Sequence, residues 1–346
     1  MNINVINPLS DSRWSDLVAT HPNASVFHQP GWLKALARTY RYEPLVLTSA
    51  SVSQPLNDGI VLCRVSSWIT GTRLVSLPFA DHCEPLMNSH DESNEFMDRL
   101  RRECDGQGWQ YVEMRPLSCT PDIGGGLRPS GSFWVHELDT RPNIGRLFQQ
   151  LHRNSFQRKI HRATMEELSY EAGNSKMLMD EFYRLLLVTR RRHQLFPQPR
   201  TWFRNLAECF RDKLKIGVAR KNGVAIGATI SLRHQSTVVY KYGCSDSRFH
   251  RLGAMPFLFW KLVQEAKESN AEKIDFGRTD LDNDGLIHFK DRFGTTRRLI
   301  TYYRYSDGRE RTNIVGSTSR GLRGLCALLP DTLFASAGGL LYRHIG

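Results

Sequence analysis

The clearest alternation of apolar and polar residues begins at residue 237. Residues 237–243 alternate with a period of two, which is typical of a strand and puts Val238, Tyr240 and Tyr242 on one face. Apolar residues then recur at helical spacing from 258 to 266, and residues 273–277 predict a second strand. A helix that joins two such strands is the usual crossover of a parallel or splayed pair.

The start of this helix is a candidate binding site for a phosphate. Pro256 indicates that the helix begins nearby, because proline lacks only an N–H that the first turn does not need. The free N–H groups and the dipole of a helix start favour an anion. The predicted phosphate-binding residues are Arg248, Arg251, Gly253 and Ala254.

The same order of elements occurs in both halves of the chain. The first half predicts helices, a hairpin over 44–65 whose turn needs a positive φ at Gly59, a strand at 73–77, a helix at 91–106 and strands at 109–115 and 132–138. The second half predicts helices at 147–167, 176–193 and 200–213, strands at 214–220 and 224–232, the strand–helix–strand unit and a strand at 297–305. We therefore predict two α/β domains with mixed sheets, 1–142 and 143–305.

Residues 306–346 form a tail that is first basic and then apolar, with Pro330 and Asp331 as interruptions. Such a pattern is typical of an amphipathic helix on an anionic membrane. A helix packed back on the domain is the alternative, and the sequence leaves both open.

The net charge of +12 and the pI near 9.5 favour an acidic partner. Nucleic acid, a phosphorylated substrate, a nucleotide cofactor and an anionic membrane all fit, and a basic but unspecialised surface is the alternative. Seven scattered cysteines, a start without a basic and apolar leader, and the lack of a membrane-length apolar run predict a cytoplasmic protein with free thiols. Paired Cys/His spacings, HExxH and GxSxG are absent from the sequence, so we expect no metal and no covalent nucleophile.

Several segments resemble the FemAB family and its exopolysaccharide-associated relatives. In the second half these are Leu151–Ala163, Phe182–His193, Asp275-Phe-Gly-Arg278 and His288-Phe-Lys-Asp-Arg-Phe-Gly294. In the first half they are Val26–Trp32, Leu77–Asp81 and Glu113–Arg115. The resemblance extends roughly from residue 26 to residue 305.

The resemblance implies two tandem domains of the GNAT acyltransferase fold. It implies an acyltransferase that moves an acyl or aminoacyl group to an amine, often on a peptidoglycan or other cell-envelope precursor, without a covalent intermediate. Acyl-CoA or aminoacyl-tRNA would be the donor. The acceptor would be an anionic, phosphorylated small molecule or a lipid-linked one. The protein would then work in the cytoplasm, and its tail could contact the inner face of the membrane.

The chain departs from the family pattern in two places. The helical arm that some members insert in the second domain has no room here. The CoA-binding loop of GNAT enzymes is degraded, because Gly253 matches its pattern whereas His250 and Met255 do not.

Three residues are candidates for catalysis. Lys290 could clamp a phosphate or stabilise an oxyanion, or belong to a solvated basic turn. Its replacement by methionine would then remove activity and leave stability nearly unchanged. Asp275 could orient the amine or act as a base, or pair with Arg278 at the strand end. Tyr242, like Tyr240 on the same predicted face, could donate a hydrogen bond or line an acyl slot, or belong to the core.

Substrate binding is assigned to a cleft between the two halves. The candidate residues are Asp81, His82, Arg115, Arg190, Arg278 and Arg292. Two basic helical rows, at 153–162 and 190–192, read as solvated faces or as contacts for tRNA or anionic lipid.

Two other functions remain open from the sequence. One is an acetyl-CoA-dependent GNAT enzyme that acts on a small amine. The other is a non-catalytic, basic nucleic-acid-binding module that kept the fold.

Overall fold

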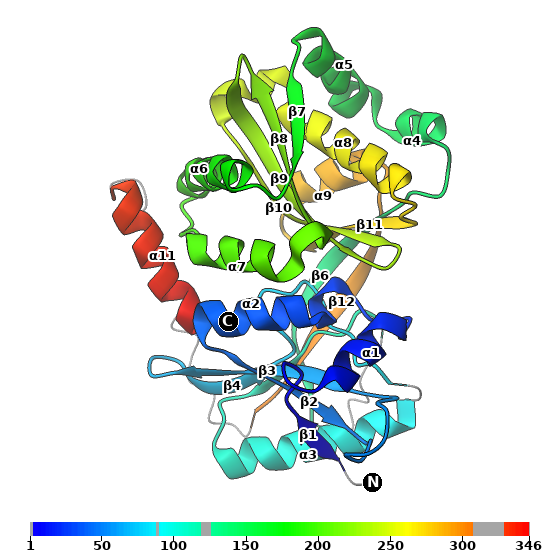
Figure 1. Cartoon of the computed structure of the whole chain (residues 1–346), viewed down its shortest axis with the longest axis vertical. Coiled ribbons are helices and arrows are strands. Elements are labelled where there is room, and N and C mark those ends of the chain that lie inside the picture. Colours follow the sequence, from blue (N-terminus) through cyan, green and yellow to red (C-terminus); the bar gives the residue numbers. More distant parts are fainter. Residues whose placement is uncertain (1–2, 88–89, 119–125, 307–328, 346) are drawn as a thin grey trace. The chain divides into compact units, whose positions relative to one another are not determined.

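The computed structural model describes residues 3–87, 90–118, 126–306 and 329–345, and no side chains of 90–94 (Figure 1). The chain divides into two compact units. The first comprises the described residues within Met1–Ser132, Ile300–Leu322 and Gly339–Gly346, and the second those within Phe133–Leu299 and Arg323–Gly338. The sequence-based domain limits at residues 142 and 305 do not coincide with these divisions, and as limits of domains they stay a prediction.

The first unit is a mixed sheet with helices on both faces (Figure 1). Its elements are β1 (Asn4–Ile6), α1 (Ser12–Thr20), η1 (Val26–His28), α2 (Pro30–Tyr40), β2 (Glu43–Thr48), β3 (Ile60–Ser67), β4 (Gly71–Val75), α3 (His90–Gln107) and β5 (Val112–Met114). The strand order is β1-β2-β3-β4-β5, followed by the end of β12 (Thr296–Tyr305), and only β4 and β5 pair in parallel among these strands. Phe96, Met97 and Leu100 pack α3 onto the sheet.

The turn before β3 differs from its prediction. The β2–β3 hairpin is present, but Gly59 does not have a positive φ. A Cβ at Gly59 would lie 2.8 Å from the ring of Trp14 and 3.1 Å from Val46. Glycine is therefore needed there because α1 packs closely against the hairpin, whereas the tight turn itself does not require it.

The second unit is also a mixed sheet between two helical layers (Figure 1). Its elements are β6 (Arg128–Asp139, which begins in the first unit), α4 (Ile144–Gln150), η3 (Arg153–Gln157), α5 (Arg158–Met165), β7 (Ser169–Gly173), α6 (Lys176–Arg192), α7 (Arg200–Phe210), η4 (Arg211–Lys213), β8 (Leu214–Lys221), β9 (Val224–His234), β10 (Thr237–Ser245), η5 (Ser247–Leu252), α8 (Ala254–Glu268), β11 (Lys273–Asp280) and α9 (Asp284–Arg292). The strand order is β6-β11-β10-β9-β8-β7. The crossover from β10 through α8 to β11 gives the parallel pair that the sequence predicted.

The helix predicted at 147–167 is interrupted. The helix α4 ends at Gln150, and the imidazole Nδ1 of His152 accepts a hydrogen bond from the N–H of Ser155, 3.2 Å away. One turn of π-helix, η3, then leads into α5, and the edge strand β7 follows where no strand was predicted. The interruption lets the basic helix α5 take its own direction across α8.

Part of the tail folds into α11 (Asp331–Ile345). Phe334 is fully buried, its ring centroid lies 5.6 Å from that of Phe196, and the Arg191 guanidinium lies 4.6 Å from its centroid. The beginning of α11 is therefore packed back on the second unit. The basic residues of the tail between 309 and 323 lie outside the described residues. Within the described ranges, no helix is both long and apolar enough to cross a membrane.

Candidate functional site

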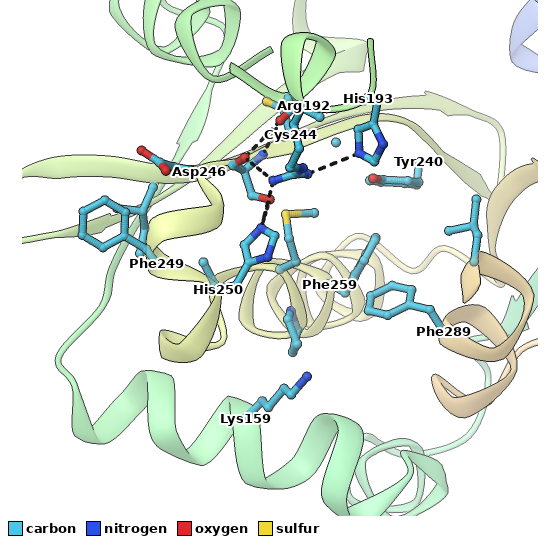
Figure 2. Close-up of a pocket in the computed structure, with 18 of the residues that line it drawn as sticks. Lys159, Arg192, His193, Tyr240, Cys244, Asp246, Phe249, His250, Phe259 and Phe289 are labelled. Carbon is cyan, nitrogen blue, oxygen red and sulfur yellow. Dashed lines mark hydrogen bonds between the residues drawn. The ribbon is translucent and has the colours of Figure 1, made fainter. Parts of the chain in front are cut away.

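A pocket of about 350 Å³ lies within the second unit (Figure 2). Its walls come from α5, the end of α6, β9, β10, η5, the start of α8 and α9. The lining residues are Lys159, Thr189, Arg192, His193, Ile226, Tyr240, Gly243, Cys244, Ser245, Asp246, Phe249, His250, Ala254, Met255, Pro256, Phe259, Leu286, Phe289 and Lys290.

The pocket forms where two parallel strands part. The strands β10 and β11 pair only from Thr237 to Val239 and from Lys273 to Asp275. The register of β10 against β9 then shifts between Tyr240 and Tyr242. A bulge of this kind bends a strand and re-aims its side chains.

The bulge corrects the prediction that Tyr240 and Tyr242 share a face with Val238. Tyr240 packs against Phe259 of α8, with ring centroids 4.8 Å apart, and lines the pocket. Tyr242 turns to the opposite layer, where its hydroxyl accepts a hydrogen bond from Trp202 Nε1 of α7 at 2.8 Å. The predicted catalytic tyrosine therefore does not line the pocket, whereas its neighbour does.

Tyr240 and Gly243 shape the inner wall. A Cβ at Gly243 would collide with the Tyr240 hydroxyl, so glycine leaves the room that this ring occupies. Burial raises the pKa of Tyr240 well above its ordinary value. Burial likewise raises the pKa of the Cys244 thiol, so that Cys244 stays protonated and is a poor nucleophile.

The end of α6 supplies a cation to the pocket. The Nη1 of Arg192 donates to the carbonyl oxygen of Ser245 at 3.3 Å and lies 3.2 Å from Nε2 of His250 (Figure 2). The Ser245 hydroxyl lies 3.0 Å from the same nitrogen. Burial and the Arg192 charge lower the pKa of His250, and the same two causes lower the pKa of His193. Both imidazoles are therefore neutral at neutral pH.

Lys159 reaches the pocket from α5, opposite Arg192 (Figure 2). Its position depends on Gly253, whose φ is +77° and where a Cβ would lie 2.5 Å from the carbonyl oxygen of Lys159. The N-cap residue of α8 is Gly253, which has no side chain to cap the helix. The predicted phosphate site thus includes Lys159, which was not predicted for it. Gly253 contributes because its lack of a side chain allows α5 to pack closely against the start of α8.

The other predicted phosphate ligands have different positions. Ala254 lines the pocket. Arg248 does not line it, because its guanidinium is paired with the Asp246 carboxylate at 2.6 Å. Arg251 is exposed outside the lining, and its carbonyl oxygen accepts from Arg162 at 3.4 Å.

Lys290 is 5% exposed and lies in the pocket wall. Its Nζ donates to the carbonyl oxygens of Gly277 (3.0 Å) and Arg278 (3.3 Å) and contacts Thr279 Oγ1 (2.8 Å). A solvated basic turn is therefore excluded. The buried charge is fixed at the pocket and held by strand β11.

Asp275 shapes the strand that holds Lys290. Its carboxylate accepts a hydrogen bond from the N–H of Gly277 at 2.7 Å, where φ is +68° and the register of β11 shifts. This bulge turns the carbonyl oxygens of Gly277 and Arg278 toward Lys290. Asp275 is buried and does not line the pocket, and its catalytic role stays a prediction.

The remaining predicted residues lie outside the pocket lining. Arg190 is half-buried, Arg292 is exposed, and the Arg278 guanidinium stacks 4.3 Å from the Phe133 ring centroid. In the first unit Arg115 binds Glu113 at 2.8 Å and the carbonyl oxygens of Leu77 and Ala80.

Asp81 and His82 also have structural contacts in the first unit. The Asp81 main chain accepts from the Tyr302 hydroxyl at 2.6 Å, and the buried His82 ring packs edge-on to Phe27. The predicted binding roles of these residues, and a cleft between the halves, stay predictions.

His136 makes the stability of the second unit depend on pH. Burial and the nearby Lys290 charge lower its pKa to about 4 from an ordinary 6.5. The unfolded chain therefore binds a proton first as the pH falls, so stability is full above about 6.5 and is lost toward pH 4. The loss is about 3 kcal/mol, at roughly 1.4 kcal/mol for each pKa unit.

We expect the variant His136→Gln to remove about this much of the acid-induced loss in urea titrations between pH 7 and 4. His234→Gln is the matched control, because His234 also has a pKa near 4 but lies at the far end of β9 from the pocket. His234→Gln should likewise reduce the dependence of the free energy of unfolding on pH, and it should leave ligand binding unchanged. An unchanged profile in His136→Gln would contradict the assignment.

The lining residues that the sequence did not single out as a site include Lys159, Arg192, His193, His250, Phe259 and Phe289. In the sequence, Lys159 and Arg192 stand out only as members of basic rows. Their spacing along the chain does not indicate that they line one pocket, because α5 packs on α8 whereas α6 packs on β8, β9 and β10. Among the described residues, no group of three His, Cys, Asp or Glu could hold a metal ion.

Residues 150–291 match the family model described as an acetyltransferase (GNAT) domain. A curated relative, the UDP-N-acetylmuramoylpentapeptide-lysine N(6)-alanyltransferase of Weissella viridescens, is 26% identical over 137 residues, which are 38% of this chain. The match spans 40% of the length of that relative.

Solved structures show the same fold. FemX superposes with a TM-score of 0.70 at 13% identity over 88% of this chain and 97% of that one. A tandem GNAT protein from the clavulanic acid biosynthesis pathway superposes with a TM-score of 0.56 at 12% identity over 89% and 99% of the two chains.

The C-terminal domain of a putative lysylphosphatidylglycerol synthetase from Agrobacterium fabrum gives a TM-score of 0.53 at 14% identity over 92% and 96%. The α/β fold and the tandem arrangement predicted from the sequence are thus confirmed, and residues 150–291 are similar to a GNAT acetyltransferase domain.

Proposed function

We propose that this chain transfers an aminoacyl group from a phosphate-bearing carrier to an amine of a cell-envelope precursor. The observation that carries the proposal is the pocket of the second unit. Aromatic side chains from three elements, Tyr240, Phe259 and Phe289, line it, and the cations Lys159 and Arg192 flank it. Such a site accepts an acyl group inside and carrier phosphates at its rim.

The reaction is a direct transfer. The lone pair of the amine attacks the ester carbonyl, the new C–N bond forms, and the C–O bond to the carrier breaks. The amine loses a proton, and the leaving oxygen takes one up. The Lys290 charge in the pocket wall would stabilise the negative charge that develops on the carbonyl oxygen.

The same charges favour the reactive form of the acceptor. An ammonium ion is disfavoured near Lys159, Arg192 and Lys290, because like charges lower its pKa. The Asp246 carboxylate offers little compensation, since Arg248 already pairs with it. The pocket therefore favours the neutral amine, which is the nucleophile.

The aminoacyl donor and the envelope acceptor follow from the relatives. The curated relative is named as an alanyltransferase that acts on a lysine of a UDP-linked pentapeptide, which supports aminoacyl transfer over simple acetylation. The degraded CoA loop also supports aminoacyl transfer over acetylation, since His250 of that loop contacts Arg192 and Ser245. A cytoplasmic site of action and a contact of the tail with the inner face of the membrane belong to the same proposal.

The test offers the full chain aminoacyl-tRNA, acetyl-CoA or a long-chain acyl-CoA, each with a UDP-linked muramoyl pentapeptide. Mass spectrometry of the acceptor then detects the amide. We expect a mass increase with an aminoacyl donor only. Transfer from a CoA thioester alone would contradict aminoacyl transfer, and the lack of any product with all three donors would contradict the acceptor class.

A variant pair ties the product to the pocket. Leu286 lines the pocket and is 38% exposed, whereas Leu281 is 46% exposed and lies outside the lining. We expect Leu286→Trp to fill the pocket and lower kcat/KM about 100-fold, as misplacement of a substrate does. Leu281→Trp should leave kcat/KM unchanged. Equal values of kcat/KM in the two variants would show that transfer does not take place in this pocket.

A further inference from the structure

One wall of the pocket consists of aromatic and aliphatic side chains that contact one another. The ring centroid of Phe259 lies 4.8 Å from that of Tyr240 and 5.4 Å from that of Phe289. Figure 2 shows these three rings next to one another in the pocket. Met255 and Leu286 line the same pocket. We call these five residues the apolar wall.

The protein itself covers the apolar wall incompletely. Phe259 is only 4% exposed, but Tyr240, Met255 and Phe289 are half-buried, and all four line the pocket. Apolar surface that faces water is unfavourable, and a ligand that removes it from water gains free energy. The wall therefore favours a ligand group with an apolar surface of its own.

The volume of the pocket indicates the size of that group. Its 350 Å³ hold at least about ten water molecules, at about 30 Å³ of liquid volume each. The single methyl group of an alanyl donor would leave most of this volume to water. An aromatic or branched aliphatic side chain displaces several waters and covers more of the apolar wall.

The charges of the lining argue against a cationic side chain. Lys159 and Arg192 flank the pocket, and Lys290 lies in its wall. Among the described residues that line the pocket, only Asp246 is acidic, and its carboxylate pairs with Arg248 at 2.6 Å. An ammonium or guanidinium group would meet like charges without a free carboxylate. Three exposed acidic residues before and at the start of α9 lie outside the lining, namely Asp280, Asp282 and Asp284.

The cations are poorly placed for an anionic side chain. Arg192 donates to the carbonyl oxygen of Ser245, and Lys290 donates to the carbonyl oxygens of Gly277 and Arg278. Lys159 is exposed and is assigned to the carrier phosphates at the rim. A carboxylate against the apolar wall would lose its hydration without a new partner there.

We propose that the pocket selects aminoacyl donors with a bulky apolar side chain, aromatic or branched aliphatic, over donors with a small or a charged one. This inference rests on the proposed function, since it names the group that is transferred. The α-amino group and the carrier are common to all aminoacyl donors, so the side chain alone discriminates among them. The curated relative is named as an alanyltransferase, and a group that small would not cover the apolar wall.

The experiment measures the binding of stable donor analogues to the full chain by isothermal titration calorimetry. In each analogue an amide replaces the ester between the amino acid and the 3′ position of adenosine 5′-monophosphate. The amino acid is phenylalanine, leucine, alanine, lysine or glutamate, and one reference compound carries none. We expect the phenylalanyl and leucyl analogues to bind about 10- to 100-fold more tightly than the alanyl one, as burial of one large apolar side chain allows.

The lysyl and glutamyl analogues should bind no more tightly than the alanyl one. Equal dissociation constants of the alanyl and phenylalanyl analogues would overturn the inference, and so would tightest binding of a charged analogue. Equal binding of the reference compound and the phenylalanyl analogue would also overturn it, because the nucleotide would then supply all of the affinity.

A pair of variants links the selection to the apolar wall. Leu286→Glu puts a carboxylate into the lining, in the first turn of α9, where the helix dipole favours an acidic residue. We expect it to weaken binding of the phenylalanyl analogue about tenfold and to strengthen binding of the lysyl analogue about tenfold. Leu281→Glu adds the same charge outside the lining and should change either affinity less than twofold. Equal changes in the two variants would contradict a role of the wall.

Transfer assays separate this inference from the proposed function. Transfer of alanine in preference to phenylalanine to the UDP-linked acceptor would overturn the selection and leave the proposed function intact. Tight binding of the phenylalanyl analogue without transfer from any aminoacyl ester would support the selection and refute the proposed function.

Discussion

Replacing Lys290 by methionine is expected to lower kcat at least 100-fold and the free energy of unfolding by about 2 to 3 kcal/mol. The kinetic loss is the size expected when one group that stabilises an oxyanion is removed, about 100- to 1,000-fold. The loss of stability follows from burial. Methionine leaves the carbonyl oxygens of Gly277 and Arg278 without the Nζ that they accept from, at about 1 to 3 kcal/mol for a buried unsatisfied group.

The sequence alone predicted that this variant would keep its stability, and the contacts of Lys290 with β11 reverse that prediction. Urea unfolding and single-turnover transfer measure the two effects separately.

Thr279→Val removes one contact of Lys290 but keeps the charge of the lysine, so it should lower stability by about 1 kcal/mol and leave most of the transfer rate. Lys273→Met, in the same strand but with a partly exposed ion pair to Glu137, should change little in either measurement. A fully active Lys290→Met would show that the lysine is structural.

The variant Gly253→Ala is expected to destabilise the protein by about 3 kcal/mol and to weaken donor binding. An alanine at φ +77° adopts a left-handed conformation that costs about 1 to 2 kcal/mol. Its Cβ would also lie 2.5 Å from the carbonyl oxygen of Lys159, and such overpacking adds about 1 to 3 kcal/mol. Because the obstacle is main chain, α5 has to move away and takes Lys159 with it.

Gly223 provides the matched control. It has the same φ of +77° in the β8–β9 hairpin, but nothing lies within 4 Å of its added Cβ. Gly223→Ala should therefore show only the conformational cost of about 1 to 2 kcal/mol. Chemical denaturation of both variants isolates the contact with α5. Equal losses of stability would mean that α5 does not depend on this contact, and donor binding should then be normal.

Much of the fold was readable from the sequence because it depends on local patterns. The alternation at 237–243, the helix around Pro256 and the strand at 273–277 recur in the structure as β10, α8 and β11. The turn Lys221-Asn-Gly223 is a two-residue hairpin with positive φ at Asn222 and Gly223, as its residue types require. The resemblance of its motif singled out Lys290, and this residue does line the pocket.

The rest of the site depends on local irregularities and side-chain contacts that do not change the periodic pattern of the sequence. One extra residue in β10 moves Tyr242 out of the pocket and leaves Tyr240 in it, so the strand periodicity wrongly puts both rings on one face. The π-helical turn before α5 interrupts a pattern that reads as one helix. Arg248, the predicted phosphate ligand, lies outside the pocket lining, and its guanidinium pairs with Asp246.

By itself the sequence determined most of the helices and strands, the tandem α/β fold and the excess of positive charge, because these depend on residue types and spacings along the chain. Only the tertiary structure decided which cations reach the pocket. Lys159, Arg192 and Lys290 come from three helices spread over more than a third of the chain. Their convergence depends on a strand bulge, on the parting of β10 from β11 and on the close approach that Gly253 permits. Each of these is a contact between distant residues, and the spacing of residues along the chain does not encode it.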